Sequence, residues 1–111
     1  MKNKPTVKLF LDDVRYPPNE TWTLVRSVED CLYLLLTSKV SILSLDHDMG
    51  EGEPTGLDLA KKMGSLPSYH WPRTIYIHSM NPVGKNSMAD ELYHTAPPGV
   101  SIYKFGPKGD D

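Results

Sequence analysis

Three clusters of polar residues follow short apolar stretches of the chain, and their side chains are of types that bind metals or transfer protons. The clusters are Asp12-Asp13 after residues 7–11, Asp46-His47-Asp48 after residues 41–45, and His78-Ser79 after residues 74–77. Short, nearly continuous apolar runs are typical of strands buried in a parallel sheet. Because ligand sites of open parallel sheets lie at the carboxyl ends of the strands, we expect the three clusters to meet at one edge.

The carboxylates suggest a metal site. Asp12, Asp13 and Asp46 form an oxygen-rich set suited to a hard divalent cation, Mg²⁺ or Mn²⁺. Without a cation, such clustered carboxylates repel one another, and one tends to stay protonated. Acidic residues after a strand are also common turn formers and helix caps, so each pair alone has a purely structural interpretation. Three clusters at equivalent positions favour a shared functional site.

Two histidines add groups that can exchange protons near neutral pH. His47 and His78 are candidates for general acid and general base. They are also candidates for ligands of a softer metal, or for residues that only form hydrogen bonds or pack. Because adjacent strand residues point to opposite faces, Asp46 and His47 share a site only if the strand has already ended there.

Several residues near these clusters are candidates for binding a phosphate. The helix predicted to begin at Asn81 would present free N–H groups and the positive end of its dipole to an anion. Ser79, Asn81 and Lys85 would add hydrogen bonds and charge there. Arg15, just after the first cluster, and Lys104, at the end of the last predicted strand, are further candidates. Simpler roles remain open, with Asn81 as a helix cap and the two basic residues as surface charges.

The pattern of apolar residues and caps predicts the elements that position these clusters. Strands are expected at residues 7–11, 22–26, 41–45, 74–77 and 100–103, and helices after Ser27, Thr55 and Asn81. The apolar helix positions expected to face the core are 28, 31, 32, 35 and 36, then 59, 60, 63 and 66, then 88, 92 and 96. This order predicts one α/β domain over residues 1–111, an open sheet of about five mostly parallel strands with helices on both faces. Residues 107–111 are expected to be a frayed tail.

The connection between the first two strands departs from the usual pattern. A parallel crossover needs about a dozen residues or more, usually with a helix. The segment between Asp12 and Trp22 is shorter than a helical crossover. Either the second strand is antiparallel, or an irregular loop makes the crossover without a helix.

Composition limits the class of partner. The 111 residues carry a formal net charge of -2 with a pI of about 6.0, which excludes a bulk basic surface for extended nucleic acid. A short RNA end or a small nucleotide remains compatible. The single cysteine, Cys31, excludes an intrachain disulfide, fits a reducing compartment and is expected in the core. No apolar run approaches the ~20 residues of a membrane span, so a soluble cytoplasmic domain is expected.

The residues around the clusters resemble a known fold family. Four stretches resemble the strand ends of response-regulator receiver domains. They are residues 9–13, residues 43–46 with Gly56 following, residues 77–79 and residues 103–104. The resemblance implies a receiver or flavodoxin-like fold whose first crossover helix is missing or collapsed here. It also implies an acidic pair at Asp12 and Asp13, a phosphoacceptor at Asp46, a hydroxyl at Ser79 and a lysine at Lys104.

Longer motifs resemble a divergent branch, the cyclic-phosphate-processing receiver domains. These are Leu-Asp-Asp-Val-Arg-Tyr-Pro-Pro (11–18), Ser-Leu-Asp-His-Asp-Met-Gly (44–50) and Ile-His-Ser-Met-Asn-Pro-Val-Gly (77–84). His47, Asp48 and His78 distinguish them from ordinary receivers. This resemblance implies action on the cyclic phosphate ends of RNA, as in RNA repair, or on related cyclic nucleotides.

Together these features predict a metal-assisted phosphoesterase. A divalent cation between the first aspartates and Asp46 would polarise a cyclic phosphodiester. His47 or His78 would activate water and the other would protonate the leaving oxygen, with Asp48 orienting an imidazole. A covalent phosphoacceptor role for Asp46 is a variant. Two other functions are a non-catalytic binder that sequesters a cyclic nucleotide in phage or bacterial defence conflict, and a signalling receiver phosphorylated on Asp46.

Overall fold

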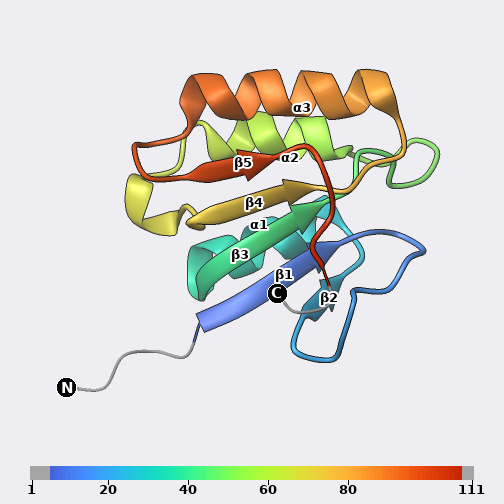
Figure 1. Ribbon diagram of the computed structural model, residues 1–111, viewed down its shortest axis with the longest axis horizontal. Coiled ribbons are helices and arrows are strands. Elements are labelled where there is room, and N and C mark those ends of the chain that lie inside the picture. Colours follow the sequence, from blue (N-terminus) through green and yellow to red (C-terminus); the bar gives the residue numbers. More distant parts are fainter. Residues whose placement is uncertain (1–5, 109–111) are drawn as a thin grey trace.

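Five parallel strands form a single sheet in the computed structural model, which describes residues 6–108 (Figure 1). The order of strands across the sheet is β2-β1-β3-β4-β5. Along the chain the elements are β1 (Thr6–Leu11), β2 (Thr23–Val25), α1 (Val28–Thr37), β3 (Lys39–Leu45), α2 (Gly56–Met63), the 3₁₀ turn η1 (Ser68–His70), β4 (Thr74–Ile77), α3 (Pro82–Thr95) and β5 (Ser101–Tyr103).

The second strand is parallel to the first, so an irregular loop makes the crossover. Leu9 pairs with Thr23 in the register of β1 and β2. The Arg26 guanidinium ties the crossover loop to the strands, since its Nη1 lies 3.2 Å from the carbonyl oxygen of Asp12 and 3.1 Å from that of Arg15.

The predicted helix starts are confirmed by their caps. The Ser27 hydroxyl accepts the N–H of Asp30 at 3.1 Å, and Thr55 forms a capping box with Asp58. The Asn81 side chain accepts the N–H of Gly84 at 3.0 Å, with proline at the first helical position. Side-chain caps of this kind satisfy N–H groups that have no partner within the helix, which explains why the boundaries can be predicted from local sequence.

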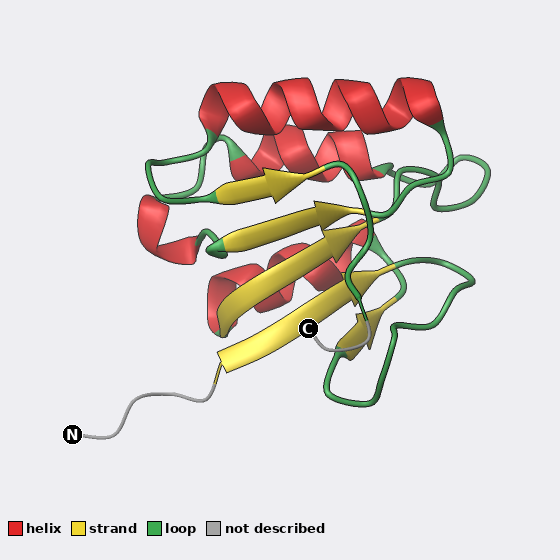
Figure 2. Cartoon of the chain, viewed as in Figure 1, coloured by secondary structure: helices red, strands yellow, loops and turns green. Residues whose placement is uncertain are grey.

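The expectation of helices on both faces is wrong, because α1, α2 and α3 all lie on one side of the sheet (Figures 1 and 2). Parallel crossovers are right-handed, so the direction of a crossover decides which face its helix covers. The crossovers through α1, α2 and α3 all run toward β5. The β1 to β2 crossover runs in the opposite direction, but it is a loop and provides no helix for the other face.

The core lies between the three helices and the sheet. One cluster of fully buried residues includes Leu9, Leu43 and Ile75 on the strands and Cys31 and Leu35 on α1. The predicted core position of the cysteine is therefore confirmed. Trp22 and Trp71, which are 6% and 7% exposed, both pack as expected. Leu36 was expected in the same stripe but is 46% exposed, because it lies at the edge of the face that α1 turns toward the sheet.

The opposite side of the sheet, here called the open face, carries a row of three aromatic residues and one serine. Phe10, Ser44, Tyr76 and Tyr103 are register partners across β1, β3, β4 and β5. After β5 the chain crosses in front of this face (Figure 1). A Cβ atom on Gly106 would lie 3.1 Å from the Cβ of His78, so this segment passes close to the end of β4. Of the predicted tail at 107–111, residues 109–111 lie outside the described residues.

None of the helices within residues 6–108 has the length and apolar character that a membrane span requires.

Candidate functional site

Three of the predicted site residues meet at the carboxyl edge of the sheet. Asp12, Asp46 and His78 each follow a strand directly, and one potential ligand atom from each lies within 4.8 Å of the others. Their positions continue the alternation of Phe10 and Ser44, so they belong to the open face. Strand alternation therefore places the first residue of each polar cluster on the open face.

Asp12 is held rigidly. It is fully buried, and its Oδ1 accepts the N–H groups of Val14 at 2.9 Å and Arg15 at 2.8 Å. Its Oδ2 lies 3.0 Å from Nε2 of His78. Burial by itself raises the pKa of Asp12, but the N–H groups of Arg15 and Val14 together with His78 outweigh it and leave the pKa below its ordinary value. Asp12 is therefore an ionised carboxylate at neutral pH.

Both ring nitrogens of His78 have partners. Nδ1 lies 2.6 Å from the Ser44 hydroxyl, Nε2 faces Asp12, and the ring stacks on Phe10 with centroids 4.3 Å apart. Burial lowers the pKa of His78, although the Asp12 carboxylate opposes this shift. An ionised carboxylate can only accept, so Nε2 donates to Asp12 and the Ser44 hydroxyl donates to Nδ1 of a neutral ring. Ser44 was missed in the sequence, where its signal is a polar residue two positions before Asp46.

The pKa of Asp46 is shifted upward, in the opposite direction from that of Asp12. It is 5% exposed and accepts the backbone N–H of His47 at 2.8 Å. Burial raises its pKa, and the charges of Asp12 and Asp13 add to this rise, while the His47 N–H and the Arg15 guanidinium oppose it. The net direction is upward, so burial beside two other carboxylates disfavours the ionised form of Asp46.

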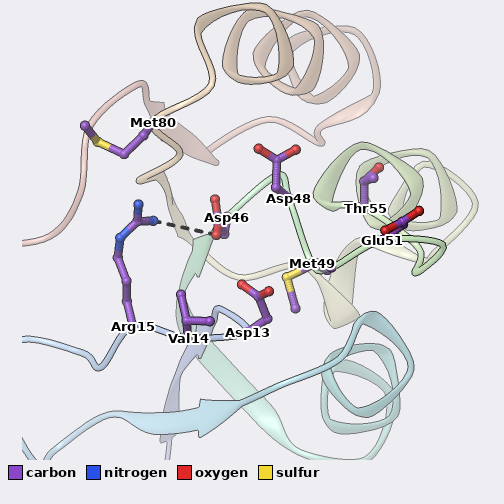
Figure 3. Close-up of a pocket in the computed structure, with 10 residues that line it drawn as sticks. Asp13, Val14, Arg15, Asp46, Asp48, Met49, Glu51, Thr55 and Met80 are labelled. Carbon is purple, nitrogen blue, oxygen red and sulfur yellow. Dashed lines mark ion pairs between the residues drawn. The ribbon is translucent and has the colours of Figure 1, made fainter.

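Arg15 places its guanidinium beside the carboxylates of Asp12 and Asp46. Its Nη1 lies 3.5 Å from Oδ2 of Asp12 and 3.7 Å from Oδ2 of Asp46, and Figure 3 shows the side chain directed toward Asp46. The Arg15 side chain is 47% exposed, so its guanidinium is accessible to a ligand. The residue predicted to bind phosphate therefore lies beside two carboxylates.

A cleft of about 490 Å³ opens over these groups (Figure 3). Among the predicted residues, Asp13, Arg15, Asp46 and Asp48 line it. Asp13 lies on the cleft wall and is not part of the cluster formed by Asp12, Asp46 and His78. The remaining lining residues, which the sequence did not single out as site residues, are Val14, Met49, Gly50, Glu51, Thr55 and Met80.

His47 turns away from the carboxylate cluster toward α3. A Cβ atom on Gly84 would lie 2.4 Å from Cγ of His47, so the imidazole packs where only glycine leaves room. Its Nδ1 lies 2.8 Å from Oδ1 of Asp48, and the Asn81 amide approaches the same oxygen at 3.5 Å. The hydrogen bond from His47 lowers the pKa of Asp48. The predicted pairing of Asp48 with an imidazole is thus present, and His47 is its partner.

Four predicted phosphate ligands, Ser79, Asn81, Lys85 and Lys104, lie outside the lining of this cleft. The Ser79 hydroxyl is buried and accepts the N–H of Asn81 at 3.0 Å. Lys104 donates to the Asn86 side chain at 3.3 Å, and no ion pair joins it to Asp46 within the described part of the chain. Lys85 lies in the first turn of α3, where its N–H bonds to the carbonyl oxygen of Asn81.

The donor set suits a hard divalent cation. Asp12 and Asp46 offer carboxylate oxygens, which Mg²⁺ and Mn²⁺ prefer. Burial and the charges of Asp12 and Asp13 raise the pKa of Asp46 despite the Arg15 guanidinium, so a bound cation would stabilise the ionised form of that carboxylate. His78 donates its Nε2 proton to Asp12 and so acts on the carboxylate rather than as a ligand itself, an arrangement common around bound metals.

The strand order and the site can be compared with known proteins. The order β2-β1-β3-β4-β5 is that of flavodoxin-like sheets. A search of curated proteins found no match, and neither did a search of solved structures. The family model for the cyclic-phosphate processing receiver domain matches residues 7–94. The match includes all three polar clusters and leaves out β5 and Lys104. The chain therefore belongs to the family of cyclic-phosphate processing receiver domains.

Proposed function

We propose that this domain binds a cyclic phosphodiester and opens it by hydrolysis with the help of Mg²⁺ or Mn²⁺. The observation that carries the proposal is the meeting of Asp12, Asp46 and the Arg15 guanidinium at the edge of an open cleft. Carboxylates suit a divalent cation and a guanidinium suits phosphate oxygens, so the two halves of a phosphoryl-transfer site lie side by side. Family membership supports a cyclic phosphate as the substrate class.

Asp12 and Asp46 would hold the cation, with Asp13 close by on the cleft wall. A bound divalent cation supplies Lewis acidity toward a phosphoryl oxygen and neutralises charge that develops there. His78 keeps Asp12 ionised and oriented, because its Nε2 proton is directed at Oδ2 of that carboxylate. Ser44 in turn fixes the tautomer of His78.

The remaining residues bind the phosphate and move protons. Arg15 offers its guanidinium to the non-bridging oxygens. Asp48 lines the cleft and pairs with His47 at 2.8 Å, while the His47 ring itself packs against Gly84. This Asp48–His47 pair would accept the proton from the attacking water, with His47 acting through Asp48. The water oxygen forms a bond to phosphorus, one ester bond of the ring breaks, and the released oxygen takes up a proton to leave a phosphomonoester.

A second candidate function is binding without turnover. One specific observation favours it, because His78, the imidazole next to the carboxylates, has both ring nitrogens engaged. It is unable to take a proton from water while those hydrogen bonds hold. If His47 does not reach the ligand, the site would retain an intact cyclic nucleotide, as a sequestering protein does.

The test is a mass-spectrometric turnover assay. The substrates are RNA ending in a 2′,3′-cyclic phosphate and a panel of cyclic mono- and oligonucleotides, each with Mg²⁺, Mn²⁺ or EDTA. The variants are Asp46→Asn and, as a matched control, Asp90→Asn, the same chemical change at an exposed position of α3.

We expect ring opening that requires a divalent cation, disappears in Asp46→Asn and persists in Asp90→Asn. Unchanged activity in Asp46→Asn would refute the proposed site. No turnover, with intact nucleotide recovered from the denatured protein, would establish the binding function instead. A mass increase equal to one whole ring-opened nucleotide on the wild-type protein but not on Asp46→Asn would point to a phosphoacceptor role for that aspartate, because its attack breaks one ester bond of the ring and leaves the nucleoside attached through the other.

A further inference from the structure

A second, smaller cleft adjoins the carboxylate site on the open face. It measures about 300 Å³, and Arg15, Tyr16, Pro18, His78, Met80 and Pro107 contribute to its walls. Arg15 and Met80 line both clefts. A phosphate bound at the guanidinium would therefore have the carboxylates on one side and this second cleft on the other.

Tyr16 is the distinctive residue of the second cleft. It is 76% exposed, and it lines this cleft beside Arg15. The Arg26 guanidinium lies over its ring, 4.9 Å from the centroid. Arg26 also bonds to the carbonyl oxygens of Asp12 and Arg15. The ring is thus fixed to the same loop that carries the phosphate-binding guanidinium, and it still leaves most of its surface accessible.

The other walls of the cleft are apolar. Pro18 and Pro107 approach from the crossover loop and from the segment after β5, and Met80, which is 78% exposed, stands between the two clefts. A methionine side chain adapts its shape and packs well against aromatic rings. These walls suit a flat, apolar-faced group more than a second anion.

We propose that the second cleft is a nucleobase subsite, in which a base stacks on Tyr16 while the attached phosphate lies at Arg15. The inference rests on the proposed function, and it names the substrate class as a nucleoside cyclic phosphate rather than a simple cyclic phosphate ester. A ligand that fills both clefts needs an anion joined to a planar ring, which is the chemistry of a nucleotide. Stacking on an aromatic side chain tolerates any base, since every base has a π face.

The experiment compares two probes that share the cyclic phosphate and differ in the base. They are adenosine 2′,3′-cyclic phosphate and glycerol 1,2-cyclic phosphate, each with Mg²⁺. The readout is the ratio of their apparent affinities, taken as Kd if the ligand stays intact and as KM if it is opened. The variants are Tyr16→Ala and Tyr16→Phe, with Tyr69→Ala as a control at another exposed tyrosine, 80% exposed in η1.

Removing a stacking ring weakens binding of a base by roughly 5-fold to 150-fold. We expect the wild-type protein to prefer the adenosine probe by a factor in this range. Tyr16→Ala should bring the ratio close to one with little change for the glycerol probe, while Tyr16→Phe and Tyr69→Ala should keep the preference. The unchanged glycerol probe also reports that Tyr16→Ala is folded.

Two results would overturn the inference alone. One is a wild-type ratio near one with measurable binding of the glycerol probe, and the other is a preference that survives Tyr16→Ala. In both cases the proposed function would stand. If neither probe binds the wild-type protein, the proposed function and the inference fail together.

Discussion

Replacing Asp46 with asparagine should make the protein more stable when no divalent cation is present. The carboxylate is buried beside Asp12 and Asp13, and its pKa is raised by burial and by these charges. An ionised group with a raised pKa opposes folding at neutral pH. Asparagine keeps an oxygen to accept the N–H of His47 and removes the negative charge.

The size of the effect follows from the geometry. Facing oxygens of Asp12 and Asp46 lie within 4.8 Å. At that distance two unit charges repel by about 1–3.5 kcal/mol for an effective dielectric constant between about 80 and 20. The attraction between Asp46 and Arg15, whose side chain is 47% exposed, offsets about 0–1 kcal/mol of this. A net gain of about 0–3.5 kcal/mol remains, and each 1 kcal/mol of it corresponds to a rise in Tm of about 4 °C for a domain of this size.

The gain should depend on pH in a defined direction. The folded-state pKa of Asp46 lies above the ordinary value of 3.8. Between those two values the folded protein binds more protons than the unfolded chain, so wild-type stability falls as the pH rises through that window. Asp46→Asn lacks this fall. Its advantage should be absent in acid and complete at neutral pH.

A divalent cation should reverse the ranking. A ligand that binds only the folded state stabilises it by about 2.7 kcal/mol at a concentration of 100 times its Kd. The wild-type protein should gain this stabilisation from Mg²⁺ or Mn²⁺, while Asp46→Asn should lose most of it. Urea denaturation in EDTA and in a cation series measures both effects. Asp90→Asn, which changes an exposed aspartate, should stay within about 0.5 kcal/mol of wild type throughout.

Lower stability of Asp46→Asn in EDTA at neutral pH would refute the electrostatic reasoning. Equal stabilisation of both proteins by the cation would separately refute the metal site at Asp46. A more stable variant without activity would show that loss of turnover comes from loss of the carboxylate and not from unfolding.

Three further substitutions or treatments test the supporting structure. Ser44→Ala leaves Nδ1 of His78 buried without its donor, so the free energy of unfolding measured in urea should fall by about 1–3 kcal/mol. The ¹⁵N shifts of the His78 ring should change as well. A fall of less than about 0.5 kcal/mol would contradict the hydrogen bond. Gly84→Ala places a Cβ atom 2.4 Å from the His47 ring, so it should lower turnover and reduce the free energy of unfolding by about 1–3 kcal/mol. Unchanged turnover would remove His47 from the mechanism. Cys31 is fully buried, and burial raises the pKa of its thiol to about 12. Thiol reagents should therefore label it only after unfolding. Rapid labelling of the native protein would contradict its place in the core.

Local patterns were sufficient to predict the elements of the fold. Helix caps at Ser27, Thr55 and Asn81 depend on hydrogen bonds within three residues, so a short stretch of sequence reveals them. The buried strands are recognisable as apolar runs, and the acidic and histidine clusters mark their carboxyl ends. The direction of β2 and the uncovered face of the sheet were not predictable in this way, because both depend on the path of the crossover loop.

The sequence by itself determined the residue types at the site and the edge of the sheet where they gather. Tertiary structure decided which of them meet. Strand alternation brings Asp12, Asp46 and His78 together and turns His47 toward Gly84. That outcome depends on where each strand ends and on the register between strands, which involve residues far apart in the chain. The position of Arg15 between the carboxylates and the second cleft likewise follows from the folding of the crossover loop back onto the sheet.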